Sequence, residues 1–246
     1  MLSLRAVEKR YGSERAIGPI DLDFESGTTA LIGPSGCGKS TLLRLLVGLV
    51  RPDVGEVRFD GALLTDESLP AVRRRIGYVI QDGGLFPHLS AEDNICLLAR
   101  QSGWQRARIR ARLEELAQLV HLSEDALRRF PLQLSGGQRQ RVSLMRALML
   151  DPDVVLLDEP MGALDPMIRA ELQVDLKEIF ARLGKIVVLV THDLGEAGFL
   201  APRIALMKDG LILQLAALEA FYEAPADPFV TRFVRAQTYK RPPVTL

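Results

Sequence analysis

The stretch GPSGCGKST, Gly33–Thr41, decides which fold this chain adopts. Its spacing fits the phosphate-binding loop pattern G-x-x-x-x-G-K-[ST]. An apolar segment, Thr28–Ile32, comes before the loop and predicts a strand, and Ser40–Leu49 comes after it with the apolar content of a helix. Glycines allow backbone N–H groups to approach phosphate oxygens, and a helix N-terminus favours an anion. The stretch therefore predicts a strand–loop–helix unit that binds a nucleoside triphosphate.

Two side chains of this loop have chemical roles in the prediction. Lys39 contacts the β- and γ-phosphates as a mobile positive charge, and the Ser40 hydroxyl coordinates Mg²⁺. Cys37 occupies a variable position of the pattern and receives no redox role. The nucleotide-binding residues predicted here are Gly33, Pro34, Ser35, Gly36, Cys37, Gly38, Lys39, Ser40 and Thr41.

A second motif, VVLLDEP at Val154–Pro160, places two carboxylates after a continuous apolar run. Such a run is typical of a strand buried on both faces of a parallel sheet, and ligands bind at the carboxyl ends of these strands. We expect Asp158 to hold Mg²⁺ and Glu159 to act as general base for an attacking water. The alternative is a solvated Asp-Glu pair that only ends a strand. The phosphate loop in the same chain favours the catalytic interpretation.

A third stretch, LSGGQRQR at Leu134–Arg141, puts Ser-Gly-Gly before a segment, Gln138–Leu150, that predicts a helix. Small residues at a helix start suit an anion-binding site. They equally suit a serine N-cap with a turn, which is the commoner arrangement. On these residues alone the N-cap is favoured.

Composition limits the other possibilities. The 246 residues include 31 Lys and Arg and 31 Asp and Glu, so the net charge is zero and nucleic acid is not an expected partner. Two cysteines, Cys37 and Cys96, cannot build a disulfide framework, which favours a reducing compartment. The N-terminal residues lack the apolar run of a signal peptide, and no apolar stretch has the length of a membrane span. Action at a membrane would therefore need a partner.

The order of apolar patterns predicts an α/β protein, a single domain over 1–246, with a helical block of about 86–150 inserted into a core of about 1–85 and 151–246. Further strands are expected at Glu56–Phe59, Ile76–Ile80 and Ile186–Val190, and a hairpin at Arg203–Met207 and Leu211–Leu215. Further helices are expected at Ala107–Val120, Ile168–Leu183, Leu194–Leu200 and Asp227–Val234.

The three motifs, in this order and over nearly the whole chain, resemble the ATP-binding subunits of ABC transporters, with LSGGQ as the most specific match. The resemblance implies a P-loop NTPase core of ABC ATPase type, with an N-terminal antiparallel β subdomain and an inserted α-helical subdomain. It implies that Gln81 is the Q-loop glutamine at the γ-phosphate and metal, and that Ala163–Asp165 is the D-loop, with Asp165 near the nucleotide. It implies that His192 is the switch histidine and that Tyr11 stacks on adenine. Without the resemblance His192 would be an ordinary loop histidine, and Tyr11 an ordinary core or rim aromatic.

The resemblance also implies how the site is completed. Two cassettes would pack head to tail as a homodimer, or with a similar second chain. The signature residues of one would then bind the γ-phosphate held by the other; these residues are Ser135, Gly136, Gly137 and Gln138. The cofactors are ATP and Mg²⁺. The catalytic residues are Glu159, His192, Gln81 and Lys39, and the metal-binding residues are Ser40, Gln81 and Asp158.

The partners implied are integral membrane permease subunits and an extracytoplasmic solute-binding protein, with this chain peripheral at the cytoplasmic face of the membrane. The loop Asp82–Asn94 would dock on the permease through Leu85, Phe86 and Pro87, which we expect to be exposed. The alternative is that Leu85 and Phe86 pack locally between the core and the helical block.

The stretch QDGGLFPHLSAEDN and the GALDP segment resemble import cassettes for glycine betaine, choline and related osmoprotectants, with polar amino acid importers next. Met161, Leu215 and the absence of a regulatory domain after Val234 depart from that pattern and leave the solute open. A non-transport ABC ATPase acting on ribosomes or DNA, and a small-molecule kinase, are the rival classes. The neutral charge and the LSGGQ motif, respectively, argue against them.

Overall fold

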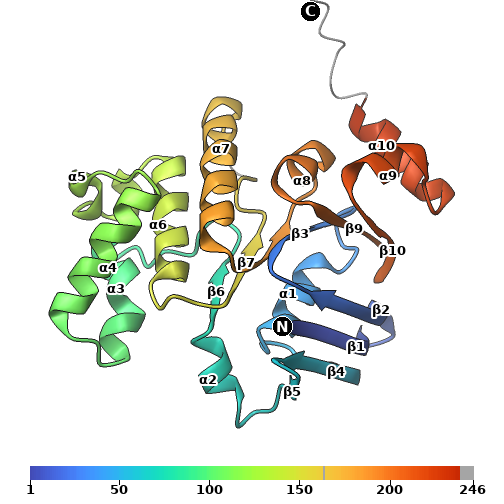
Figure 1. Cartoon of the computed structure of the whole chain (residues 1–246), viewed down its shortest axis with the longest axis horizontal. Coiled ribbons are helices and arrows are strands. Elements are labelled where there is room, and N and C mark those ends of the chain that lie inside the picture. The colour runs from blue at the N-terminus through green and yellow to red at the C-terminus, as the bar shows by residue number, and fades with distance from the viewer. Residues whose placement is uncertain (163, 239–246) are drawn as a thin grey trace, which may run out of the picture. The chain divides into compact units, whose positions relative to one another are not determined.

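The computed structural model describes residues 1–162 and 164–238 (Figure 1). Contacts divide the chain into two compact units. The first comprises Met1–Leu69 and Ile186–Leu246, and the second comprises Pro70–Lys185. The boundaries predicted for the helical block, 86–150, stay a prediction, because the second unit contains that block together with flanking strands and a helix.

The first unit begins with an antiparallel sheet in the order β2-β1-β4-β5. Its strands are β1 (Leu2–Tyr11), β2 (Glu14–Phe24), β4 (Val54–Phe59) and β5 (Ala62–Leu63). The paired register of β1 and β2 runs from Leu2 opposite Phe24 to Tyr11 opposite Glu14. Apolar side chains of both strands are buried, which gives the sheet one core-facing side. This sheet agrees with the N-terminal antiparallel β subdomain that the family resemblance implies.

The same unit contains the parallel strands that carry the phosphate loop. Strand β3 (Gly27–Ile32) lies between β8 (Ile186–Val190) and β9 (Arg203–Lys208), parallel to both. Strand β10 (Leu211–Ala216) pairs antiparallel with β9, as the hairpin signal predicts. All five residues of β8 are buried, which agrees with its continuous run of β-branched and leucine side chains.

Four helices accompany these strands: α1 (Lys39–Leu46), α8 (Leu194–Leu200), α9 (Leu218–Glu223) and α10 (Pro228–Thr238). Helices α8 to α10 gather beside β9 and β10 (Figure 1). One apolar core joins them to the sheet through Ile32, Leu194, Ile204, Phe221 and Val230, each at most 1% exposed. The C-terminal helix is therefore fixed to the helix that follows β8.

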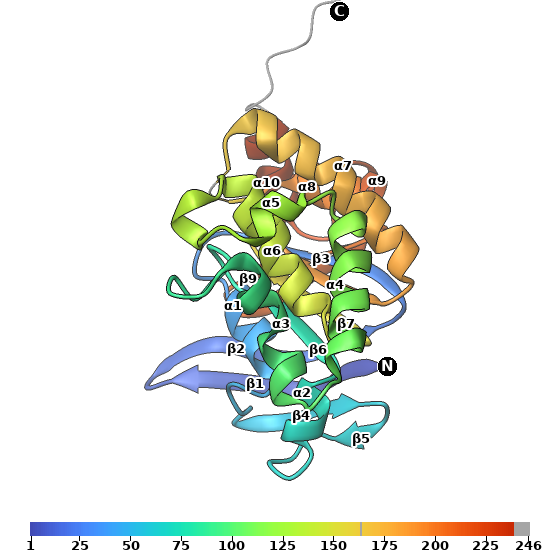
Figure 2. The ribbon, with the colours of Figure 1, turned by 90° about the vertical axis from the view of Figure 1, so that its left-hand side faces the viewer.

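The second unit has two parallel strands, β6 (Ile76–Val79) and β7 (Val154–Asp158). Its helices are α2 (Leu69–Arg73), α3 (Ala91–Gln101), α4 (Arg106–Leu119), α5 (Glu124–Leu127), α6 (Gly136–Leu148) and α7 (Pro166–Leu183), with a 3₁₀ turn at Pro131–Gln133. Helices α3, α4 and α6 pack side by side (Figure 2). Helix α6 also lies against β6 so closely that a Cβ on Gly77 would overlap the Ala147 carbonyl.

The predicted α/β fold and its elements are confirmed, with differences at their ends. Helix α1 ends at Leu46 instead of Leu49, because Gly48 takes a φ of 66°. Helix α6 begins at Gly136 instead of Gln138. The sequence did not reveal the lengths of β1 and β2 or the separate helix α3. Among the described residues no helix combines the length and the apolar content that crossing a bilayer requires.

Candidate functional site

The phosphate loop connects β3 to α1 and is closed over its own lysine. Lys39 is 6% exposed, and its Nζ donates hydrogen bonds to the carbonyl oxygens of Gly33 and Pro34, both at 2.9 Å. Its Nζ also lies 3.8 Å from the Cys37 Sγ. The loop thus holds the ammonium group at the start of α1, surrounded by acceptors that an anion can replace.

Glycines are required in this loop by contact with neighbouring strands. Gly33 has a φ of 146°, and a Cβ there would overlap the Met207 carbonyl of β9 and lie 2.8 Å from the Cys37 Sγ. Gly38 has a φ of 107°, and its Cβ would overlap the Ala16 carbonyl of β2. Both positions combine a backbone conformation and a close approach that only glycine tolerates.

The thiol of Cys37 lies inside the loop. Burial raises the pKa of Cys37, although the neighbouring Lys39 ammonium acts in the opposite direction. The group is therefore a protonated thiol at neutral pH, which makes it a poor nucleophile.

His192 and the phosphate loop leave the same edge of one sheet. Strands β3 and β8 pair in parallel, and the Thr191 N–H donates to the Leu31 carbonyl at 3.1 Å. His192 follows with an exposed side chain. Its carbonyl accepts a hydrogen bond from Gln237 Nε2 of α10 at 3.0 Å. Sequence reasoning missed Gln237, because the two residues are far apart in the chain and share no motif.

Tyr11 ends β1 with 51% of its surface exposed. Lys9 Nζ lies 5.7 Å from the centroid of the Tyr11 ring, and the same Nζ is paired with Asp53 at 2.8 Å. The Tyr11 ring therefore exposes aromatic surface to solvent, beside a lysine that its ion pair with Asp53 holds in place.

In the second unit, the parallel pairing of β6 and β7 brings Gln81 and Asp158 to one edge, since Val79 stands opposite Leu157. Asp158 is the last residue of β7 and is 5% exposed. Glu159 follows with a φ of 46°, which is uncommon for a residue with a side chain and costs about 1–2 kcal/mol. Strained backbone of this kind is concentrated at functional sites.

The signature Leu134–Gln138 forms a helix cap. The Gln138 N–H donates to Ser135 Oγ at 3.2 Å, and the Ser135 N–H donates to Gln138 Oε1 at 3.0 Å. This reciprocal pair is a capping box, so the N-cap interpretation of the serine is confirmed. A phosphate role is compatible with the cap, because the hydroxyl accepts in this bond and its own proton stays available as a donor.

The two signature glycines lie where side chains cannot fit easily. A Cβ on Gly136 would lie 2.8 Å from Leu164 Cδ2, and a Cβ on Gly137 would lie 2.8 Å from Ile168 Cγ2. Asp165 caps α7 by accepting from the N–H groups of Met167 and Ile168. The structure thus brings the signature together with the predicted D-loop, of which Ala163 is outside the described residues.

The loop after Gln81 partly meets the expectation of exposed apolar residues. Phe86 is 44% exposed and Pro87 is exposed, whereas Leu85 is half-buried. Asn94 of α3 is fully buried and holds the loop: its Oδ1 accepts from the Phe86 N–H at 2.7 Å, and its Nδ2 donates to carbonyl oxygens of Phe86, Leu89 and Ser90. The exposed ring of Phe86 is therefore presented by a fixed backbone.

The residues predicted to bind Mg²⁺ have suitable chemistry. The Ser40 hydroxyl, the Gln81 amide and the Asp158 carboxylate all carry oxygen donors, which Mg²⁺ prefers. No group of three or more His, Cys, Asp or Glu that could bind a metal occurs among the described residues.

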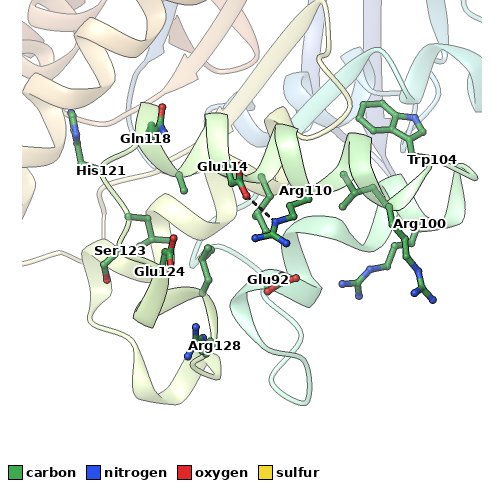
Figure 3. A pocket seen from close by; sticks show the side chains of 16 residues that line it. Glu92, Arg100, Trp104, Arg110, Glu114, Gln118, His121, Ser123, Glu124 and Arg128 are labelled. Atoms are coloured by element: carbon green, nitrogen blue, oxygen red, sulfur yellow. Dashed lines mark hydrogen bonds and ion pairs between the residues drawn. The ribbon is translucent and has the colours of Figure 1, made fainter.

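A groove of about 1360 Å³ lies elsewhere, on the surface of the helical block (Figure 3). Residues of α3, α4 and α5 line it, with buried Ile109 and Leu113 beneath charged side chains such as Arg110 and Glu114, which pair at 2.9 Å. None of the predicted nucleotide residues lines this groove. Its charged rim is a solvated helix face, so its volume alone assigns no function.

Comparison with known proteins places this geometry in a family. A family model described as ABC transporter matches residues 17–162. The glycine betaine/carnitine/choline transport ATP-binding protein OpuCA of Bacillus subtilis is 42% identical over 95% of this chain, which spans 62% of the length of that protein. The glycine betaine uptake system ATP-binding protein YehX of Escherichia coli is 44% identical, over 95% of this chain and 76% of its own. The dimeric structure of MJ0796, a bacterial ABC transporter cassette, matches with a TM-score of 0.80 and 35% identity, over 89% of this chain and 99% of that one.

Substituting the loop glycines tests the close packing described above. In Gly33→Ala the added methyl group must displace the loop from β9. Overpacking of this kind costs about 1–3 kcal/mol, so the thermal unfolding midpoint is expected to fall by several degrees. Gly36→Ala is the matched control: Gly36 also has a positive φ, 78°, but its Cβ would meet nothing within 4 Å. Equal midpoints for the two variants in a calorimetric scan would contradict the packing role of Gly33.

Proposed function

Since the chain belongs to the ABC transporter family, we propose that it binds and hydrolyses ATP to power solute import through a membrane permease. One observation carries this proposal: the buried Lys39 in a glycine loop at the start of α1, in a chain that also presents the capped signature Ser135–Gln138. A buried lysine in a glycine loop is the chemistry of a phosphate site, and the signature Ser135–Gln138 is a feature of this family.

Different residues would bind the base, the phosphates and the metal ion of the nucleotide. Tyr11 would stack on adenine, and Lys39 would exchange its loop carbonyls for phosphate oxygens, an exchange favoured by charge. Ser40, Gln81 and Asp158 would hold Mg²⁺, which, when bound, neutralises charge on the phosphate oxygens. The amides of the first turn of α1 would add donors, since helix geometry leaves them without intrahelical partners.

Hydrolysis would depend on Glu159 and His192. Glu159 would take a proton from the attacking water, and its left-handed backbone would set the direction of its side chain. His192 would contact the γ-phosphate, with its backbone steadied by Gln237. Positioning of this kind, together with charge stabilisation, supplies most of the catalysis in phosphoryl transfer.

The signature would act on a second copy of the chain or on a similar cassette. Ser135 would donate its hydroxyl proton to the γ-phosphate bound by the partner, and Asp165 would lie near the same nucleotide. A relative whose structure matches with a TM-score of 0.80 is itself dimeric, which supports this arrangement. One cassette alone would then hold an incomplete site and would be inactive.

The remaining partners follow from import. The loop Asp82–Asn94 would dock on permease subunits through Phe86 and Pro87, which would place the chain at the cytoplasmic face of the membrane. An extracytoplasmic solute-binding protein would deliver the solute. The names of the two relatives support an osmoprotectant of the quaternary amine class as that solute.

The catalytic proposal predicts a trapped dimer. Glu159→Gln keeps size and hydrogen bonding but removes the base, so ATP should bind, hydrolysis should fall at least about a hundredfold, and the variant should elute as a dimer with ATP and as a monomer without it. Size-exclusion chromatography and an ATPase assay measure both.

Two further variants assign the cause of dimerisation. Adding Ser135→Arg to Glu159→Gln should abolish the ATP-dependent dimer while nucleotide binding persists, because the long side chain fills the space of the partner's phosphate. Lys39→Ala should abolish the dimer by losing nucleotide affinity. If Glu159→Gln/Ser135→Arg still dimerised as well as Glu159→Gln, Ser135 would be a helix cap only.

The docking proposal predicts that Phe86→Asp weakens co-purification with the permease and leaves ATP binding intact, because a carboxylate in an apolar contact is costly. Tyr222→Asp is the matched control, since Tyr222 is an aromatic residue of α9 with 54% exposure. Undiminished association of Phe86→Asp, or equal losses in both variants, would count against this surface.

The solute proposal predicts that deleting the gene for this chain abolishes cellular uptake of labelled glycine betaine or choline. Restoring the unaltered chain should restore uptake, and restoring Glu159→Gln should not. Loss of polar amino acid uptake with betaine uptake intact would establish the alternative solute class.

A further inference from the structure

The loop that follows Gln81 is attached to the signature helix by side chains. Arg146 of α6 donates to the Gly84 carbonyl at 2.8 Å through one guanidinium nitrogen and to the Gly83 carbonyl at 2.7 Å through the other. Ser143 Oγ lies 3.0 Å from the same Gly83 carbonyl and 3.0 Å from the Arg139 carbonyl of its own helix, so its single proton is shared between these two acceptors. Two side chains of one helix therefore hold two successive carbonyls of the loop.

The loop backbone is shaped for these bonds. Asp82, Gly83 and Gly84 all have positive φ, at 60°, 76° and 53°. A Cβ on Gly83 would overlap Ser143 Oγ, and a Cβ on Gly84 would overlap Ile80 Cδ1. The glycines thus allow a turn that side chains would prevent, and that turn brings their carbonyls to α6.

The attachment is partly desolvated, which makes it strong. Gly83 is buried and Arg146 is half-buried, and burial lowers the pKa of the Arg146 guanidinium. Hydrogen bonds from a charged donor are stronger than neutral ones, and a buried carbonyl left without its donor is costly. The loop and α6 are therefore expected to move as one body at this point.

The far end of the loop is attached to α3 by Asn94, which bonds to Phe86, Leu89 and Ser90. Helix α3 packs along α6. The segment from Gly83 to Ser90 is thus held at both ends, so that a displacement of Gly83 and Gly84 reaches the exposed Phe86.

Helix α6 connects this attachment to the signature. Ser135 caps its first turn, and Ser143 and Arg146 lie two to three turns further on, three residues apart and so on one helix face. A continuous α-helix is stiff over such a distance, roughly 15 Å. A shift imposed at the capped end is therefore delivered at the attached end.

We propose that Ser143 and Arg146 are positioning residues that couple contact at the signature to the position of the docking loop, and that Phe86 reports this position to the permease. The inference rests on the proposed function, because the contact at the signature is the nucleotide of the partner cassette. It concerns neither nucleotide binding nor dimer formation, which other residues carry.

The experiment measures hydrogen exchange of residues 82–90 in the Glu159→Gln background, with and without ATP, alongside size-exclusion chromatography. In Glu159→Gln itself, ATP should produce the dimer and change the exchange of this segment. Arg146→Met keeps the apolar stem but removes the donors, so the segment should exchange about tenfold faster without ATP. The dimer should still form, and more than half of the ATP-dependent change should be lost.

Three further variants complete the test. Ser143→Ala and Arg146→Lys each keep part of the attachment and should lose a smaller part of the ATP response; they decide the matter if Arg146→Met does not fold. Arg110→Met is the matched control, because Arg110 is an exposed arginine of the same unit paired with Glu114, and it should behave as the parent.

The possible failures are distinguishable. If Glu159→Gln does not dimerise with ATP, the proposed function fails, and this inference with it. If the dimer forms but residues 82–90 show no ATP response, or the response in the folded Arg146 and Ser143 variants equals that in Arg110→Met, the coupling is overturned while the proposed function stands.

Discussion

The N–H groups at the start of a helix have no partners within the helix, and the structure meets this constraint in two ways at its two glycine-rich helix starts. Helix α1 has Gly38 as its N-cap, with no hydrogen bond from a capping side chain. Helix α6 has Ser135 and Gln138, which satisfy each other's N–H groups. The first arrangement has a glycine loop and no capping side chain, whereas the second builds a helix end that its own side chains cap. The proposal that α1 begins at a nucleotide site and α6 begins at a capped signature rests on that difference.

Several elements of the fold follow from local sequence. The continuous apolar runs of β7 and β8 predicted buried strands, and the glycine spacing predicted the phosphate loop. Both predictions succeeded because the residues that determine each structure lie within one short segment. The capping box was likewise readable from Ser135 and Gln138. For His192 and Tyr11 the family resemblance was needed, since a single histidine or tyrosine has no local pattern.

The contacts that sequence reasoning missed are long-range bonds from side chains to backbone. Gln237 reaches the His192 carbonyl, and Arg146 reaches Gly83 and Gly84, across 45 and at least 62 residues of chain. Every residue has a backbone carbonyl that can accept a hydrogen bond, so no sequence pattern shows which carbonyl a distant side chain will contact. The left-handed backbone of Glu159 was equally hidden, because glutamate does not favour that conformation.

A count of donors and acceptors shows that Ser135 can be a helix cap and still have a proton to donate to a phosphate. A hydroxyl has two lone pairs and one proton. The cap uses a lone pair, to which Gln138 N–H donates, and Gln138 Oε1 in turn accepts from the Ser135 N–H. These two bonds fix the position of the oxygen but leave its proton unassigned, and Ser135 is exposed. The cap would therefore hold in place a donor for the anion of the proposed function, and the neighbouring glycines, where a Cβ would crowd Leu164 and Ile168, add no side chain beside it.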